Sequence, residues 1–460
     1  MSRPHIVIMG AGISGLTLGW NLMRQDPEIR LTILEKEPKA GGWIRTEVKD
    51  GFLFEKGPHS CRSGGTGVYT LQLIEALGLQ DQWIGADLKS NKRFIYRENG
   101  LTSLPSNPVS FLCSPFAKMS LRFFQEWFIE KSLLEDESVF DFFSRRFGKE
   151  ITETFVDPMV SGIYAGDMRQ LSMQSCFPAI HRYEQKHGSV FGAMLRSMIP
   201  SKNRQTQVSP FIIQARKFSI FSFRRGMGTL IDALSHHVKD SLVFDTVATS
   251  LHIDPHSLKI TLNNGSFIEA DQLFLAVPAE AAMSLLGPEY VTMDWKGQLR
   301  QPVSVAVVNM GWKRDVLKRK GFGYLVPTSE KEDVLGVLWD SSVFPQQNGC
   351  PGETRMTVML GGAHRKELLS LPERQLIDIS LATLARHLGV DKLPDALDVT
   401  YARQAIAQYT VGHSQFVAKI RDELKIRTQD RVHLLGSAWD GVSVNDCIAN
   451  ALNVLPRALP

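Results

Sequence analysis

Three glycines and one acidic residue near the start of the chain have the types and spacing that dinucleotide binding requires. Gly10, Gly12 and Gly15 form a G-x-G-x-x-G motif, and Glu35 follows 20 residues after Gly15. The first glycine permits a tight turn, the second lets the backbone approach a pyrophosphate, and the third allows close packing of helix on strand. A carboxylate at the position of Glu35 can accept a hydrogen bond from a ribose 2′-hydroxyl, which disfavours the 2′-phosphate of NADP.

A strand, a helix and a second strand must position these residues. Residues 6–9 form a short apolar run that is typical of a buried parallel strand, and residues 16–23 continue as a mostly apolar helix. Residues 31–34 predict the second strand, which ends on Glu35. This βαβ unit places the phosphates at the N-terminus of the helix. The pair Gly41-Gly42 follows closely, and we expect it to make a second close approach to the same ligand.

Composition excludes several other classes of protein. With 460 residues, the chain is expected to form two or three domains. Its 52 basic and 48 acidic residues nearly cancel, so nothing in the charge requires nucleic acid. The five cysteines are scattered and form no C-x-x-C pair, which argues against a disulfide framework or a zinc site, and we assign no metal. No secretory signal is expected before the first strand, and no apolar run is long enough to predict a membrane span.

Later strands indicate that the nucleotide-binding fold is interrupted. Residues 273–277 predict another buried parallel strand, and residues 432–435 a late one that precedes a helix over 443–455. Valine-rich segments at 303–310, 334–338 and 355–360 predict a separate antiparallel sheet. The sequence therefore predicts an α/β protein whose nucleotide fold is completed near the C-terminus.

Residues 92–147 are rich in aromatic side chains interspersed with cations. One interpretation is a set of helices packed on an internal core, and the alternative is an amphipathic surface in a lipid interface. Spacing alone leaves both open. The aromatic residues are Phe111, Phe116, Phe123, Phe124, Trp127, Phe128, Phe140, Phe142, Phe143 and Phe147.

No catalytic dyad or metal motif accompanies the glycine motif. This combination suits a flavin enzyme, in which the cofactor carries the redox chemistry and the protein orients the substrate. Seven further motifs carry a family resemblance, in the order GGWIR (41–45), FEKGP (54–58), LSMQSCFP (171–178), GFGYLVP (321–327), TVMLGG (357–362), QYTVGH (408–413) and GVSVNDCI (441–448). With them the chain resembles the oxygen-dependent, FAD-containing protoporphyrinogen oxidases of the flavin amine oxidase superfamily, and its Asn445-Asp446-Cys447 is similar to the animal mitochondrial branch.

The resemblance implies three domains. A discontinuous Rossmann-like FAD-binding domain would comprise residues 1–85, 241–295 and 405–460. A helical membrane-binding domain would comprise residues 86–200. A substrate-binding domain with a mixed or antiparallel sheet would comprise residues 201–240 and 296–404. The lipid-interface interpretation of the aromatic region then gains weight, as a peripheral attachment at the cytoplasmic face of a bacterial membrane or at the mitochondrial inner membrane.

The cofactor implied by the resemblance is FAD. Its expected contacts are the glycine-motif turn, the end of the second strand, the two short motifs that follow, one position in the middle of the chain and the last motif. These residues are Gly10, Ala11, Gly12, Ile13, Ser14, Gly15, Glu35, Lys36, Gly42, Trp43, Gly57, Pro58, His59, Ser60, Val247, Gly441, Val442, Ser443 and Val444.

The implied reaction oxidises a porphyrinogen to a porphyrin in three two-electron steps, with O2 as the final acceptor and H2O2 as a product. The flavin carries this chemistry, so no catalytic side chain is assigned. The expected substrate contacts are apolar walls, a cation for a propionate and a glycine that leaves room for the substrate, namely Phe322, Leu325, Met359, Arg93 and Gly166. His59 is a further candidate, and here the chain departs from the family, whose animal members carry arginine at this position and whose plant members differ. Histidine is only partly charged near neutral pH, so if it helps to hold a propionate, affinity or pH dependence is expected to differ.

Four functions stay open at this point. The first is oxidation of protoporphyrinogen IX, and its nearest alternative is oxidation of coproporphyrinogen III, which carries four propionates instead of two. An amine oxidase or carotenoid desaturase of the same superfamily is the third. A non-catalytic FAD-binding partner of the haem pathway is the fourth. The resemblance also leaves open a homodimer and a ferrochelatase as protein partners, and no nucleic acid is expected.

Overall fold

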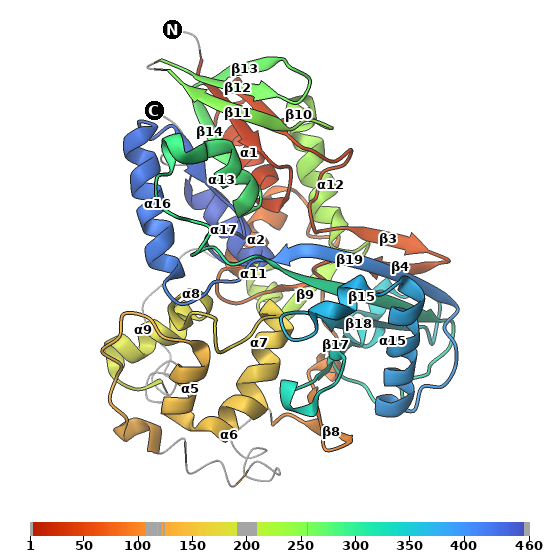
Figure 1. Ribbon diagram of the computed structural model, residues 1–460. Helices are drawn as coiled ribbons and strands as arrows, with labels where there is room; N and C mark the ends of the chain where they lie inside the picture. The colour runs from red at the N-terminus through yellow and green to blue at the C-terminus, as the bar shows by residue number, and fades with distance from the viewer. Residues whose placement is uncertain are drawn as a thin grey trace.

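The computed structural model describes residues 3–105, 117, 122, 125–190, 209–254 and 256–454. Figure 1 shows a parallel sheet at one end of the molecule, with a helical region and a larger sheet at the other end. The part of the chain that the model describes contains no helix both long and apolar enough to span a membrane.

The parallel sheet has the strand order β10-β2-β1-β14-β20. The chain supplies it from three distant regions, which confirms the prediction of an interrupted nucleotide fold. Met9 of β1 pairs with Leu34 on one side and Leu275 on the other, so the carboxyl ends of the strands lie together. The strands are β1 (His5–Met9), β2 (Arg30–Leu34), β10 (Leu242–Val243), β14 (Gln272–Leu275) and β20 (Val432–Leu434).

Both faces of this sheet are covered. One face packs against four helices in a core that includes Ile6, Leu16, Phe274 and Ile448; the helices are α1 (Ile13–Gln25), α2 (Gly67–Ala76), α12 (Gly228–His237) and α17 (Val444–Val454). The other face packs against two helices and an antiparallel sheet, which are α13 (Ala279–Tyr290), α16 (His413–Arg427), β11 (Ala248–Ile253), β12 (Leu258–Leu262) and β13 (Phe267–Ala270). Coverage on both faces explains why β1 is buried throughout.

The larger sheet has seven strands in the order β19-β15-β18-β17-β16-β7-β8. Its pairs are antiparallel except for β16 and β7, which run parallel. One face is covered by α15 (Glu373–Leu388). The strands are β7 (Arg93–Arg97), β8 (Gly100–Ser103), β15 (Val303–Trp312), β16 (Gly323–Leu325), β17 (Val334–Leu338), β18 (Thr354–Gly361) and β19 (Ala396–Ile406). The short helix α14 (Asp340–Val343) follows β17.

Two predicted domain boundaries differ from the packing. Strands β7 and β8 fall within residues 86–200, yet they extend the seven-stranded sheet and are not part of a helical unit. Phe221, Met227 and Leu234 fall within residues 201–240, yet they pack in the core of the parallel sheet. The predicted boundaries fail there because each segment finds its apolar partners in a sheet assembled from distant residues.

Small elements connect the two large sheets. The hairpin of β3 (Thr46–Lys49) and β4 (Phe52–Glu55) turns at Asp50-Gly51, as its turn residues predict. A three-stranded sheet follows, composed of β5 (Cys61–Arg62), β9 (Ile220–Phe223) and β6 (Trp83–Gly85). Beside it lies α11 (Pro210–Ala215), whose Ile212 and Ala215 are buried in the core of the parallel sheet.

The helical region has its own apolar core. Phe142, Phe143 and Phe147 are buried in it, which supports the internal interpretation for these three aromatics. Trp127 and Phe128 are exposed, and Phe111, Phe116, Phe123 and Phe124 lie outside the described residues. The helices are α5 (Val139–Phe147), α6 (Lys149–Ile151), α7 (Asp157–Tyr164), α8 (Met173–Cys176) and α9 (Pro178–His187), with a π-helical turn at Thr152–Val156 between α6 and α7.

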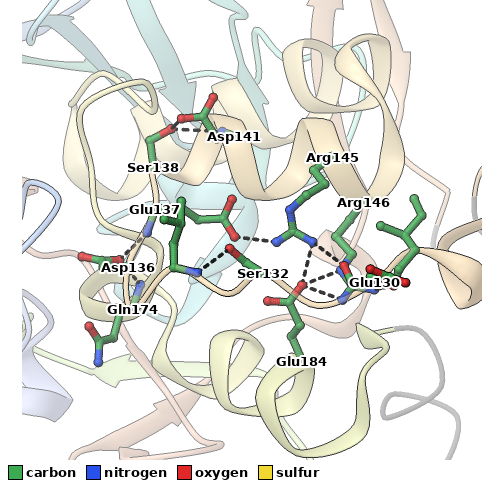
Figure 2. A network of polar contacts seen from close by, with 12 residues as sticks. Glu130, Ser132, Asp136, Glu137, Ser138, Asp141, Arg145, Arg146, Gln174 and Glu184 are labelled. Carbon is green, nitrogen blue, oxygen red and sulfur yellow. Dashed lines mark hydrogen bonds and ion pairs between the residues drawn. The ribbon is translucent and has the colours of Figure 1, made fainter.

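A buried ion network ties this region together (Figure 2). The Arg146 side chain is fully buried and lies 2.9 Å from Glu126 and 2.6 Å from Glu184. Arg145 pairs with Glu137 and with the same Glu184. A buried cation requires such partners, since removing one would leave an uncompensated charge in the interior. The network therefore fixes α5 against α9 and the segment near residue 126.

Candidate functional site

The turn between β1 and α1 has the geometry of a phosphate cradle. Gly10 has a φ of +98°, and a Cβ built there would lie 2.5 Å from the carbonyl oxygen of Ala276. A Cβ on Gly15 would lie 2.0 Å from the carbonyl oxygen of Gly10, whereas a Cβ on Gly12 would meet nothing within 4 Å. Helix α1 has no side-chain N-cap, so no side chain occupies the N-terminal backbone donors of Ile13 and Ser14 that bind anions in such turns.

The predicted second approach of the backbone lies directly beside this turn. The N–H group of Gly41 donates to the carbonyl oxygen of Ala11 at 2.8 Å, and a Cβ on Gly42 would lie 3.5 Å from the Cα of Gly12. Gly57 packs against the same loop, since a Cβ there would lie 1.9 Å from the carbonyl oxygen of Trp43. Three of the predicted cofactor segments therefore meet at one place.

Glu35 is buried at the end of β2 and its carboxylate is held by the backbone. It accepts hydrogen bonds from the N–H groups of Ala11 at 2.8 Å and Glu37 at 2.9 Å. Each carboxylate oxygen keeps a further lone pair that can accept a ribose hydroxyl. The neighbouring Lys36 side chain is exposed.

The C-terminal motif forms a second turn and helix against the first. Gly441 has a φ of +116° and precedes α17, which packs on α1. The N–H group of Gly441 donates to the Tyr409 hydroxyl at 2.8 Å, and that hydroxyl donates to the carbonyl oxygen of Ser437. Val444 is buried in the shared core, and Val442 is half-buried in the turn. The residues of the two turns fit a dinucleotide, because open backbone, an uncapped helix and a positioned carboxylate occur together.

Val247, a predicted cofactor contact, is paired through its backbone with Asn263. Its N–H group donates to the Asn263 side chain at 3.2 Å, and its carbonyl oxygen accepts from the N–H group of Asn263 at 2.8 Å. The N–H group of Val247 therefore already has a partner, whereas its carbonyl oxygen keeps a further lone pair that can accept from a ligand. Val247 stays close to the site all the same, since the carbonyl oxygen of Glu35 accepts from the N–H group of Thr246.

His59, in the loop of residues 57–60, belongs to a cluster of buried charged side chains. Nδ1 of His59 lies 2.8 Å from Oδ1 of Asp340. Burial alone would lower the pKa of His59, but the Asp340 carboxylate outweighs it and raises that pKa above its usual value. Burial would raise the pKa of Asp340, yet His59, Arg355 and Thr357 together lower it. The pair is therefore held in its ionised form.

Glu55 belongs to the same cluster. It is buried and accepts from the N–H group of Met227 at 2.7 Å and from the Thr46 hydroxyl at 2.7 Å. Burial raises the pKa of Glu55 to about 7. With His59, Asp340 and Arg355 it lines an internal cavity of about 10 Å³, which has room for roughly one water molecule.

Two of the predicted apolar substrate contacts share one face of the seven-stranded sheet. Leu325 pairs with Gly336, and Gly336 pairs with Met359 on its other side. Directly paired residues project to the same face, and the Leu325 side chain lies over Gly336, since a Cβ there would lie 3.0 Å from Cδ2 of Leu325. Both side chains are half-buried, and this face is opposite the one that α15 covers.

The predicted cation lies with the third apolar contact at the edge of this sheet. The Arg93 guanidinium lies over the Phe322 ring, 5.2 Å from its centroid. Burial, and then the charge of Arg62, lower the pKa of Arg93. Among the described residues, Arg93 takes part in no ion pair, so its charge is available to an anionic group of a ligand.

Gly166 does not line an open space. A Cβ there would lie 2.3 Å from Oε1 of Gln408 and 2.9 Å from Cδ1 of Leu171. The expected reason for a glycine was room for the substrate, and the structure corrects it: protein side chains fill the space beside Gly166.

Several residues of the site escaped prediction. Asp340 and Arg355 carry no local signal, since their roles arise from contacts across the fold, and Glu55 had only its place in the FEKGP motif. Tyr409 stood within the recognised QYTVGH motif, and that motif is the one signal that pointed to it. Among the described residues, no cluster of side chains suits a metal ion.

Comparison with known proteins defines the class. The family model for flavin-containing amine oxidoreductases matches residues 13–454. Among solved structures, an Exiguobacterium sp. 255-15 protein superposes with a TM-score of 0.83 at 23% identity, covering 100% of this chain and 99% of that one. Reduced UDP-galactopyranose mutase superposes with a TM-score of 0.71 at 16% identity, covering 99% and 96%. The chain belongs to the flavin-containing amine oxidoreductase family and is an FAD-dependent oxidoreductase.

Within this family the chain is similar to protoporphyrinogen oxidases over nearly its whole length. It is 32% identical to the enzyme of Bos taurus, covering 99% of this chain and 98% of that protein. It is 32% identical to the enzyme of Homo sapiens, covering 96% of each. Coproporphyrinogen III oxidase of Bacillus subtilis is 27% identical, covering 99% and 98%.

Proposed function

We propose that this protein oxidises protoporphyrinogen IX to protoporphyrin IX, with FAD as cofactor and O2 as the final electron acceptor. The observation that carries the proposal is the full-length similarity to protoporphyrinogen oxidases together with the Arg93–Phe322 pair beside an apolar sheet face. A tetrapyrrole is a large apolar disc with carboxylate arms, so its site requires apolar walls and cations.

The chain's own residues bind and orient both partners of the reaction. When bound, FAD supplies two-electron acceptance, which the side chains of this site do not offer. Gly10–Gly15 and the Gly41-Gly42 loop hold the pyrophosphate, and Glu35 holds a ribose hydroxyl. The turn that ends at Gly441, from the C-terminal part of the chain, completes the cofactor site. Leu325 and Met359 form an apolar wall for the macrocycle, and Arg93 binds a propionate.

Anaerobic flavin bleaching tests the proposal. Purified, flavin-loaded protein is mixed with protoporphyrinogen IX or, separately, with coproporphyrinogen III, and the flavin absorbance is followed. Rapid bleaching by the first and slow bleaching by the second is expected. A preference for coproporphyrinogen III would move the enzyme to the activity of the Bacillus subtilis relative. Bleaching by neither, with flavin still bound, would contradict a porphyrinogen oxidase.

We also propose a peripheral membrane contact through exposed apolar residues near the ion network of the helical region. Phe128 is 86% exposed and Leu133 is 97% exposed, and Trp127 and Leu134 are exposed beside them. Arg146 donates hydrogen bonds to the carbonyl oxygens of Glu126 and Ile129. The backbone that carries the exposed apolar side chains is therefore held in place. The compartment follows from the source, as the cytoplasmic face of a bacterial membrane or the mitochondrial inner membrane. A homodimer and transfer of product to a ferrochelatase stay predictions.

A further inference from the structure

The Arg62 side chain lies on the face of the small β5-β9-β6 sheet that is directed toward the Phe322 ring of the proposed substrate site. Cys61, its neighbour in β5, is buried in the core of the parallel sheet, so the alternation of a strand directs Arg62 to the opposite face. Arg62 pairs directly with Ile220 of β9, and directly paired residues share a face. Ile220 packs in a cluster against which Phe322 is also packed. The register therefore places the Arg62 side chain on the same side as the Phe322 ring.

The backbone of Arg62 is fixed beside the C-terminal turn of the site. Its carbonyl oxygen accepts from the Asn445 side chain at 2.9 Å, and Asn445 is in the first turn of α17. The Arg62 position is thus held between the nucleotide half of the site and the substrate sheet. Because this anchor uses the backbone, a change of the Arg62 side chain leaves the anchor intact.

Arg62 and Arg93 approach each other without a counter-charge. The charge of Arg62 acts on Arg93 strongly enough to contribute to its lowered pKa. Among the described residues, neither guanidinium forms an ion pair; Arg93 contacts only the Phe322 ring in this way. The carboxylate of Asp446, which follows the Asn445 that holds the Arg62 backbone, accepts from the hydroxyls of Thr66 and Ser443. Two cations that repel each other without a counter-charge form an arrangement that an anion stabilises.

We propose that Arg62 is a second substrate-binding residue, which binds one carboxylate arm of the tetrapyrrole while Arg93 binds the other. This inference rests on the proposed function, and it adds a specificity element to it. Two arginines match the two propionates of protoporphyrinogen, and a guanidinium presents the planar donors that a carboxylate accepts in pairs. The flat macrocycle then lies along the apolar face between the carboxylate anchors and Met359.

The test combines side-chain and substrate changes. Arg62→Ala and Arg62→Lys are compared with wild type in KM and in the limiting rate of flavin reduction, using protoporphyrinogen IX and its dimethyl ester. For the diacid, Arg62→Ala is expected to raise KM roughly 10- to 100-fold, which is the range for one charge-assisted hydrogen bond, with a smaller change in the limiting rate. Arg62→Lys, which keeps the charge, should recover part of the loss. For the diester, Arg62→Ala should change KM less than about twofold.

A matched control is Arg374→Ala, because Arg374 is an exposed arginine on α15 whose one ion pair within the described part of the chain is with its helix neighbour Asp378. It should leave both substrates unaffected. An unchanged KM in Arg62→Ala, or equal losses with diacid and diester, would overturn the assignment. Failure of the proposed function is recognised separately, since wild-type flavin would then not be reduced by any porphyrinogen. In that case the binding of protoporphyrin and of its diester, measured by fluorescence quenching, still decides whether Arg62 recognises the carboxylates.

Discussion

His59 and Asp340 form a buried ion pair, 2.8 Å from Nδ1 to Oδ1, between residues 281 positions apart in the chain. His59 belongs to the loop that packs against Trp43, beside the dinucleotide turn, and Asp340 begins the short helix that follows β17. The pair therefore joins the cofactor half of the site to the substrate half. Arg355 and Thr357, from β18, support the carboxylate on the substrate side.

Removing the histidine from this pair should destabilise the protein. In His59→Ala, the Asp340 carboxylate stays buried and loses its nearest cation, a change that costs about 3–5 kcal/mol in the general case. We expect about 3 kcal/mol here, since Arg355 and Thr357 remain. The thermal midpoint of flavin-loaded protein measures the effect, and His59→Gln, which keeps a hydrogen-bond donor, should lose less. Equal midpoints for wild type and His59→Ala would show that the pair does not join the two halves.

Glu55 should make stability fall as the pH rises toward neutrality. Its pKa in the folded protein is about 7, against an ordinary value of 4.5, so its contribution is fully present below pH 4.5 and is lost as the pH rises through 7. That difference corresponds to about 3 kcal/mol. In Glu55→Gln the amide can still accept from Met227 and contact Thr46, without a proton to lose. The variant should match wild type near pH 5 and exceed it near pH 8. Parallel curves of midpoint against pH for the two proteins would contradict the shifted pKa.

Gly12→Val should abolish flavin retention while leaving the fold intact. A Cβ at Gly12 meets no protein atom, so the branched side chain enters only the space assigned to the pyrophosphate. The ratio of flavin to protein absorbance after purification measures retention, and circular dichroism checks folding. Gly297→Val is a suitable control, because Gly297 is exposed in a loop far along the chain. A yellow Gly12→Val protein would remove this turn from the cofactor site.

Gly166→Ala should lower stability more than it changes substrate affinity. The added methyl group would collide with Gln408 and Leu171, and overpacking of this kind costs about 1–3 kcal/mol. Adding Gln408→Ala should recover part of the thermal midpoint. If Gly166→Ala raised KM without changing the midpoint, the original expectation of a cavity-lining glycine would be correct.

The exposed apolar segment should control membrane attachment. Phe128→Ser combined with Leu133→Ser is expected to reduce co-sedimentation with phospholipid vesicles several-fold, because burial of such side chains drives interfacial binding. The same double substitution at Phe267 and Leu393, which are also exposed but lie elsewhere in the fold, provides the control. Unchanged sedimentation of the Phe128/Leu133 variant would assign membrane contact, if any, to other residues.

The parts of this fold that local pattern determines were predictable. The turn at Gly10–Gly15 and the strands β14 and β20 carry their information within a few residues, and the structure confirms them. Assignments that depend on distant partners were not predictable in this way. Strand β7 joins the substrate sheet only because β16 lies beside it, and Gly166 is packed only because Gln408 reaches it. For the same reason, the role of Asp340 was not predictable from the sequence, because it depends on the contact with His59 in the folded chain.

The strand order of the parallel sheet has a consequence for biosynthesis. Strand β1 cannot pair with β14 until more than 260 further residues have been synthesised. Strand β14 in turn pairs with β20, which lies near the end of the chain and is followed by α17. Contacts of such long sequence separation form slowly, because loop closure precedes any gain from pairing. Nearly the whole polypeptide must therefore emerge from the ribosome before the turn at Gly10–Gly15 and the turn at Gly441 can come together. Until then the apolar faces of the nascent chain are open to aggregation, so we expect flavin supply and chaperones to limit the yield of active protein.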